Sequence, residues 1–135
     1  MGKKPLMPSS GKPTTLLVVD DDDGVLRFVC GLLERDGHKV HRARDGSEAL
    51  ALARTHGREI RVLLTDIRMP GIGGRELAAA VLRMHPHIGV IYMTGFSDEQ
   101  FERGTEALRK PFRPETLMAA VRRSSACRPS PPGTP

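Results

Sequence analysis

The chain has 135 residues, a length typical of one folded domain, and a formal net charge of +5. Many of its basic residues lie near the two ends and the rest are scattered without interleaved aromatic side chains, so we expect no direct nucleic-acid binding. No segment has the length and apolar character of a membrane span or a secretory signal, and the two cysteines form no motif. These features indicate a cytoplasmic protein with no membrane partner.

Both ends of the chain are rich in Pro, Ser and Gly, a composition typical of disordered segments. We therefore expect a flexible N-terminal flank over residues 1–13, a folded domain over residues 14–126 and a flexible C-terminal tail over residues 127–135. The sequence leaves open whether this domain stands alone or is a piece of a larger kinase or regulator, and it does not indicate the oligomeric state.

Within the folded domain, short apolar runs rich in β-forming residues alternate with segments of helical periodicity. The predicted strands cover residues 14–19, 39–43, 61–65, 89–93 and 106–109. The predicted helices cover residues 24–36, 46–56, 73–84, 97–103 and 114–125. This alternation predicts an α/β fold, a doubly wound five-stranded parallel sheet with helices on both faces.

Four consecutive aspartates, Asp20 to Asp23, directly follow the first predicted strand. Two carboxylates ~4 Å apart repel each other by about 4 kcal/mol at an effective dielectric of 20, so such a cluster calls for a compensating cation. Oxygen ligands suit a hard divalent ion, and Mg²⁺ suits them best. We expect Asp20 and Asp21, which lie closest to the strand, to face the ion. Asp22 and Asp23 are interpreted as exposed residues at the start of the first helix.

Three later strands also end in polar residues that suit phosphoryl chemistry. Asp66 follows the third predicted strand, Thr94 follows the fourth, and Lys110 follows the fifth. Lys110 is the only lysine after Lys39 in a chain that otherwise uses arginine, which indicates a need for a compact point charge. Ligands of doubly wound sheets bind beyond the carboxyl ends of the strands, so these groups are expected to meet there. A metal ion, an ammonium and a hydroxyl are what phosphoryl transfer requires.

In order and spacing, these motifs resemble those of the response-regulator receiver domains of two-component signalling. The matching segments are Val18-Val19-Asp20-Asp21, Thr65-Asp66-Ile67-Arg68-Met69-Pro70-Gly71, Met93-Thr94-Gly95 and Lys110-Pro111-Phe112. The resemblance covers nearly the whole predicted domain and implies the flavodoxin-like receiver fold with strand order 2-1-3-4-5. It also implies a sensor histidine kinase or histidine phosphotransfer protein as partner, together with a downstream protein target that the sequence does not name.

The resemblance implies a role for each site residue. Asp66 would be the phosphoacceptor, and Thr94 and Lys110 would contact the phosphoryl oxygens, with Thr94 moving toward the phosphate to transmit the signal. Mg²⁺ would be held by ligands from two strand ends: Asp21, Asp66, the backbone carbonyl of Arg68 and, through water, Asp20. Such a domain is not an enzyme in the usual sense, although self-phosphorylation from small phosphodonors and self-dephosphorylation are expected of it.

The sequence departs from the family in two places. Receiver domains commonly carry Tyr or Phe three residues before the lysine, whereas this chain has Ala107, so an aromatic rotamer switch is not available there. The connection from Thr94 to Lys110 is also short for the family, which predicts a shortened fourth helix over residues 97–103. We expect the signal to travel through rearrangement of the loop and helix after Thr94 instead.

The main alternative is an enzyme, a haloacid-dehalogenase-like phosphatase with Asp21 as nucleophile. The segment Asp21 to Val25 resembles the nucleophile motif of that family, and Thr94 and Lys110 match its second motif and its lysine. That family also needs a later strand that ends in an acidic pair, and the only acid after Lys110 is Glu115. The alternative also leaves Asp66 and the residues after it unexplained.

Two further interpretations are weaker. In a calcium-binding loop with Gly24 as its central glycine, the first and twelfth ligand positions would fall on Val19 and Cys30, which offer no carboxylate. A receiver-like domain that binds partners without being phosphorylated is a third class. The presence of every chemical group that phosphorylation needs argues against it.

Overall fold

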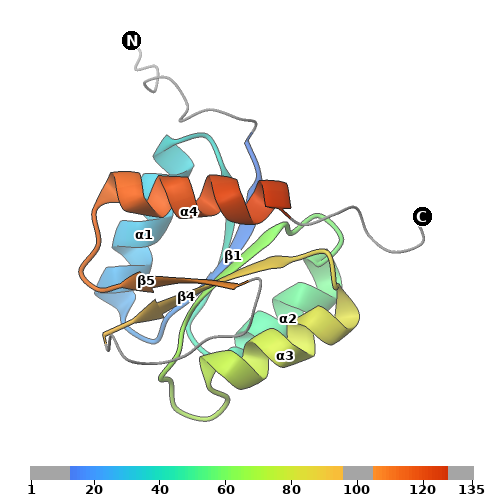
Figure 1. Ribbon diagram of the computed structural model, residues 1–135. Helices are drawn as coiled ribbons and strands as arrows, with labels where there is room; N and C mark the ends of the chain where they lie inside the picture. Colours follow the sequence, from blue (N-terminus) through green and yellow to red (C-terminus); the bar gives the residue numbers. More distant parts are fainter. Residues whose placement is uncertain (1–12, 96–104, 128–135) are drawn as a thin grey trace.

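The computed structural model describes residues 13–95 and 105–127, and strands and helices alternate along the first of these ranges (Figure 1). The strands are β1 (Thr15–Val19), β2 (Lys39–Ala43), β3 (Val62–Asp66), β4 (Gly89–Thr94) and β5 (Thr105–Arg109). The helices are α1 (Asp23–Arg35), α2 (Gly46–His56), α3 (Gly74–Met84) and α4 (Pro114–Cys127). None of these helices, within the described ranges, has the length and apolar character needed to cross a membrane.

All five strands pair in parallel, in the order β2-β1-β3-β4-β5. This arrangement confirms the predicted fold class and strand order. The observed ends of the elements lie within two residues of the predicted ones, and β2 and α2 match their predictions at both ends. The helix predicted over residues 97–103, and its shortening, fall outside the described residues, as does nearly all of the two predicted flanks.

The core has two layers, one on each face of the sheet. Helices α1 and α4 cover one face, and α2 and α3 cover the other (Figure 1). Successive residues of a strand point to opposite faces, so Leu16 and Val18 belong to the first layer and Leu17 and Val19 to the second. Strand β1 is therefore buried on both faces, which explains why its sequence is a continuous apolar run rather than an alternating one.

Aspartate side chains cap the first two helices. The Oδ1 atom of Asp22 accepts hydrogen bonds from the backbone N–H groups of Gly24 at 2.8 Å and Val25 at 3.1 Å. The Oδ1 atom of Asp45 accepts a hydrogen bond from the backbone N–H of Glu48 at 2.8 Å. Each cap satisfies backbone donors that the first helical turn leaves unpaired. Helix α1 therefore starts at a fixed residue within the acidic run that follows β1.

Candidate functional site

The parallel sheet gathers the predicted site residues at one edge. Asp20 and Asp21 follow β1, Asp66 and Thr94 are the last residues of β3 and β4, and Lys110 follows β5. Because the strands are parallel, all their carboxyl ends lie on the same side of the molecule. One carboxylate oxygen from each of the three aspartates lies within 4.8 Å of the other two. Residues far apart in sequence thus form a single acidic cluster next to an ammonium group.

The two neighbouring aspartates occupy different environments. Asp20 is fully buried; its Oδ1 atom accepts a hydrogen bond from the Asp22 N–H at 2.9 Å, and its Oδ2 atom accepts one from Lys110 Nζ at 3.1 Å. Asp21 is exposed. Both oxygens of Asp20 therefore have partners within the protein, whereas the carboxylate of Asp21 faces the solvent, from which an ion would enter.

Asp66 is half-buried, and its Oδ1 atom lies 3.6 Å from Lys110 Nζ. Burial raises the pKa of Asp66 above its ordinary value, and the negative charges of Asp20 and Asp21 raise it further, while Lys110 lowers it. The single ammonium group of Lys110 thus does not offset the combined effect of burial and the neighbouring carboxylates on Asp66. An added cation would favour the ionised form of Asp66.

The remaining predicted residues lie around this centre. Thr94 is buried at the end of β4, and its carbonyl accepts a hydrogen bond from the Lys110 N–H at 2.7 Å. Arg68 lies two residues beyond Asp66 with an exposed side chain. The structure thus brings the aspartates, Thr94 and Lys110 to one edge of the sheet, with Arg68 in the loop that follows β3.

Gly74 is a site-supporting residue that the sequence analysis did not identify. Its backbone N–H donates to the Ile67 carbonyl at 2.9 Å, and a side chain at this position would collide with the carbonyl oxygen of Asp66. The first turn of α3 thus packs directly on the backbone that carries Asp66. The Gly73-Gly74 pair in the sequence is a signal of close backbone approach, because glycine has no Cβ atom. The sequence alone does not indicate which backbone segment the pair approaches.

A hollow adjoins the acidic cluster on the side of α2 and α3. Its walls are formed by residues after β1, around the start of α2 and in the loop before α3. These residues are Asp21, Arg44, Asp45, Gly46, Ser47, Pro70, Gly71 and Ile72. Asp21 belongs both to the wall of this hollow and to the acidic cluster. A ligand in this hollow would therefore lie next to the acidic site.

Comparison with known proteins identifies the family. The family model of the response regulator receiver domain matches residues 16–122. The chain belongs to the response regulator receiver domain family. A receiver domain is a signalling domain of two-component systems rather than a classical enzyme, and this match does not favour the phosphatase alternative.

Curated relatives and solved structures agree with this assignment. The response regulator receiver protein CpdR of Brucella abortus is 31% identical over 112 residues, which are 78% of this chain and 92% of CpdR. The sensor kinase CckA of the same organism is 32% identical over 114 residues, but the match spans only 12% of CckA. A crystal structure of a response regulator receiver domain protein from Clostridium thermocellum superposes with a TM-score of 0.78 at 30% identity, covering 83% of this chain and 94% of that one.

Proposed function

We propose that Asp66 accepts a phosphoryl group in a Mg²⁺-dependent reaction and that the domain then changes conformation to control a partner protein. The observation that carries this proposal is the position of Asp66, in a cluster of three carboxylates and 3.6 Å from the ammonium group of Lys110. In the reaction, a bond forms between an Asp66 carboxylate oxygen and phosphorus while the bond from phosphorus to the donor breaks. Asp66 must be ionised to act as the nucleophile.

Lys110 and Thr94 are the proposed ligands of the phosphoryl oxygens. The Lys110 ammonium lies between Asp20 and Asp66, so a phosphoryl group on Asp66 would be close to a positive charge that is already oriented. Thr94 ends the neighbouring strand and offers a hydroxyl donor. Groups held in place before the reaction stabilise the charge that develops on the transferring phosphoryl oxygens.

The donor set of the acidic cluster fits Mg²⁺, which prefers oxygen ligands and retains several waters. We propose that Asp21, Asp66 and the backbone carbonyl of Arg68 hold the ion and that Asp20 acts through water. Burial raises the pKa of Asp66 most, and the charges of Asp20 and Asp21 raise it further, so a cation bound at this cluster would favour the ionised carboxylate that the reaction needs. When bound, Mg²⁺ would neutralise charge on the phosphoryl oxygens.

We infer that a histidine of a sensor kinase or of a histidine phosphotransfer protein is the phosphodonor in the cytoplasm. Support comes from the relatives, among which one is named a sensor kinase and another a response regulator receiver protein. Small phosphodonors would substitute for the protein donor, and the domain would later dephosphorylate itself. The downstream target would be a protein that the sequence of this chain does not identify.

The proposed signal runs from Thr94 into the segment that follows it. Ala107 is exposed on β5, in register with Tyr92 of β4, and a methyl side chain offers no aromatic ring to rotate inward. Movement of Thr94 would instead act on the segment that follows it and, through the hydrogen bond between the Thr94 carbonyl and the Lys110 N–H, on the end of β5. The output surface would therefore lie next to β4 and β5.

Intact-mass measurement after incubation with Mg²⁺ and a small phosphodonor tests the function. We expect the wild-type protein to gain one phosphoryl group, Asp66→Asn to gain none, and omission of Mg²⁺ to suppress labelling. Asp23→Asn is the matched control, because Asp23 is an exposed aspartate of the same run outside the cluster, and it should label like the wild type. Equal labelling of wild type and Asp66→Asn would refute the assignment. Turnover of phosphoesters that Asp21→Asn abolishes would establish the phosphatase instead.

A further inference from the structure

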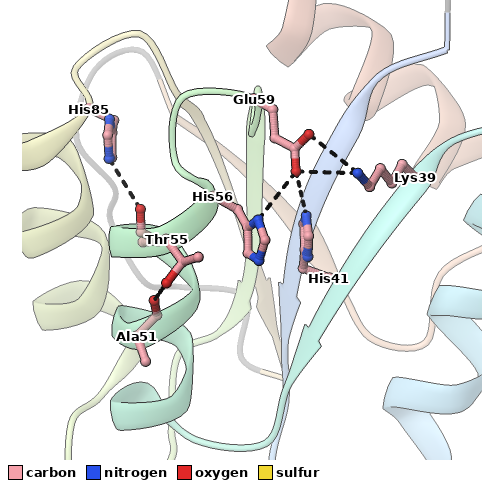
Figure 2. A network of polar contacts seen from close by, with 8 residues as sticks. Lys39, His41, Ala51, Thr55, His56, Glu59 and His85 are labelled. Atoms are coloured by element: carbon pink, nitrogen blue, oxygen red, sulfur yellow. Dashed lines mark hydrogen bonds and ion pairs between the residues drawn. The ribbon is translucent and has the colours of Figure 1, made fainter.

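A second cluster of ligating side chains lies away from the acidic edge. His41 comes from the middle of β2, His56 is the last residue of α2, and Glu59 lies in the connection from α2 to β3 (Figure 2). One ligand atom from each of the three lies within 4.8 Å of the other two. The connection that carries Glu59 enters β3 at its amino end, whereas Asp66 lies at the carboxyl end of that strand. The two clusters are therefore separate sites on one sheet.

Both imidazole rings converge on the same carboxylate oxygen. His41 Nε2 lies 3.0 Å, and His56 Nδ1 3.6 Å, from Glu59 Oε2 (Figure 2). The rings stack with their centroids 4.3 Å apart and an angle of 19° between their planes. Two imidazoles and one carboxylate thus offer ligand atoms within 4.8 Å of one another. Small rotations of the side chains would bring these atoms around one metal ion.

The cluster is reachable from solvent. The side chain of His41 is 13% exposed, that of His56 38% and that of Glu59 40%. Lys39 also contacts the cluster, with its Nζ atom 3.3 Å from Glu59 Oε1, but its side chain is 63% exposed. A long and solvated side chain leaves such a contact at little cost. Lys39 is therefore a cation that a bound metal ion would displace.

We propose that His41, His56 and Glu59 bind a divalent transition-metal ion, with Zn²⁺ as the preferred ion. Two imidazole nitrogens and a carboxylate suit Zn²⁺ and its neighbours in the series, whereas Mg²⁺ prefers oxygen ligands alone. Zinc binds nitrogen and oxygen at about 2.0–2.2 Å, so the three side-chain ends draw together around the ion. Three protein ligands leave a fourth tetrahedral position for water.

The ion would join three segments, β2, the end of α2 and the connection to β3, which the contacts of Glu59 with His41, His56 and Lys39 already link. A ligand that binds the folded but not the unfolded chain raises the apparent stability. Zn²⁺ would therefore raise the melting temperature of this domain. The site uses no residue of the acidic cluster, so this inference stands whether or not Asp66 is phosphorylated.

Calorimetric titration with Zn²⁺ in the presence of excess Mg²⁺, added to compete for the acidic cluster, tests the proposal. We expect one ion per chain and a higher melting temperature with Zn²⁺. His41→Gln retains a hydrogen-bond donor to Glu59 but loses the nitrogen ligand, and it should weaken binding by at least about tenfold. Glu59→Gln keeps the size of the side chain, loses its charge, and should weaken binding similarly.

Two further variants make the test specific. His85→Gln is the matched control, because the Nε2 atom of His85 contacts the Ala53 carbonyl outside the cluster, and it should bind Zn²⁺ like the wild type. Lys39→Met removes the competing ammonium and should bind Zn²⁺ more tightly. Absence of Zn²⁺ binding by the wild type, or affinities that are the same in His41→Gln, Glu59→Gln and the wild type, would overturn the proposal.

Discussion

At the scale of single residues, Lys110 has two tasks. Its ammonium donates to the buried Asp20 at 3.1 Å and lies 3.6 Å from Asp66, so it both balances a buried carboxylate and faces the proposed phosphoacceptor. Arginine carries the same charge on a larger planar group that cannot occupy this position in the same way. The position of the ammonium between Asp20 and Asp66 explains why lysine stands here in a chain rich in arginine.

Substitution of Lys110 by methionine should slow phosphorylation of Asp66 by about 100-fold or more, because a preorganised charge is lost at the phosphoryl oxygens. Lys110→Arg should also be slow, since its fork does not reproduce a point charge between Asp20 and Asp66. Phosphoryl incorporation followed over time by intact mass measures the rate. Lys39→Met is the control and should react at the wild-type rate, and a wild-type rate in Lys110→Met would contradict the role of this residue.

Cys30 carries a thiol, a reactive group that its buried surroundings make inert. Burial raises the pKa of its thiol from 9.0 to about 11, with smaller opposing effects of Arg42 and Glu34. Between these values the unfolded chain loses the thiol proton and the folded chain keeps it. The contribution of Cys30 to stability is therefore complete below pH 9.0 and declines as the pH rises toward about 11.

We expect Cys30 in the folded protein to resist alkylation at pH 9, because the thiolate is the reactive species. The same residue should react readily once the chain is unfolded in urea. Peptide mass spectrometry, which reports on Cys30 separately from Cys127, measures both rates. Equal rates in the folded and unfolded states would show that the thiol is neither buried nor protonated as described.

The acidic cluster was predictable from sequence and the histidine cluster was not, for a physical reason. Asp20 directly follows β1 and Asp66 ends β3, and parallel strands necessarily bring such ends together. His41 and Glu59 are 18 residues apart and belong to a strand and a connection, with His56 at a helix end. Their meeting depends on how α2 packs beside β2, which no spacing in the sequence expresses.

At the scale of elements, the contact between α3 and the end of β3 fixes where Asp66 lies. Gly74 is the first residue of α3, and a methyl group there would meet the Asp66 carbonyl and come within 2.9 Å of Ile67 Cα. Backbone atoms cannot yield as a flexible side chain does. Any larger residue must therefore push the helix and the loop apart.

Gly74→Ala should destabilise the domain and slow phosphorylation of Asp66, because the end of β3, which carries the carboxylate, must shift. Gly31→Ala is the matched control: Gly31 lies inside α1, and a methyl group added there would meet no atom within 4 Å, so alanine should stabilise the helix by about 0.5–1 kcal/mol. Urea denaturation and phosphoryl incorporation measure the two effects. Stabilisation by both substitutions would show that Gly74 is not a close-packing position.

Element boundaries were the less predictable part of the fold. Strand β3 includes Asp66, which was expected just beyond the strand, because Asp66 pairs in register with Met93 of β4. Helix α1 begins at Asp23 rather than Gly24, since the Asp22 side chain caps it there. Pairing and capping partners decide such ends, whereas apolar periodicity reports only the middle of an element.

At the scale of the whole molecule, the sheet separates two apolar layers. Val29 of α1 belongs to one layer and Val81 of α3 to the other, and both are fully buried. The alternation of strands and helices predicted two covered faces from sequence alone. The order of the strands, in contrast, was taken from the resemblance to receiver domains, because periodicity does not say which strand lies beside which.

Val29→Ala and Val81→Ala should each lower the free energy of unfolding by at least about 1.5 kcal/mol, the transfer cost of two buried carbons, with a further term for the cavity. The double variant should show the sum of the two losses within about 0.5 kcal/mol, because the two sites share no packing partners. Urea denaturation of the four proteins measures the three differences. A clear deviation from additivity would mean that the sheet transmits packing strain between the layers.

The salt bridge between Lys110 and Asp20 joins residues 90 positions apart. A growing chain holds all three aspartates of the acidic cluster as soon as β3 has been made, but it acquires the matching ammonium only after β5. Until then, the buried carboxylate of Asp20 has no such counter-charge. If Asp66 is the phosphoacceptor as proposed, its competence would therefore arise only when the last strand docks, and an incompletely synthesised chain would not respond to a phosphodonor.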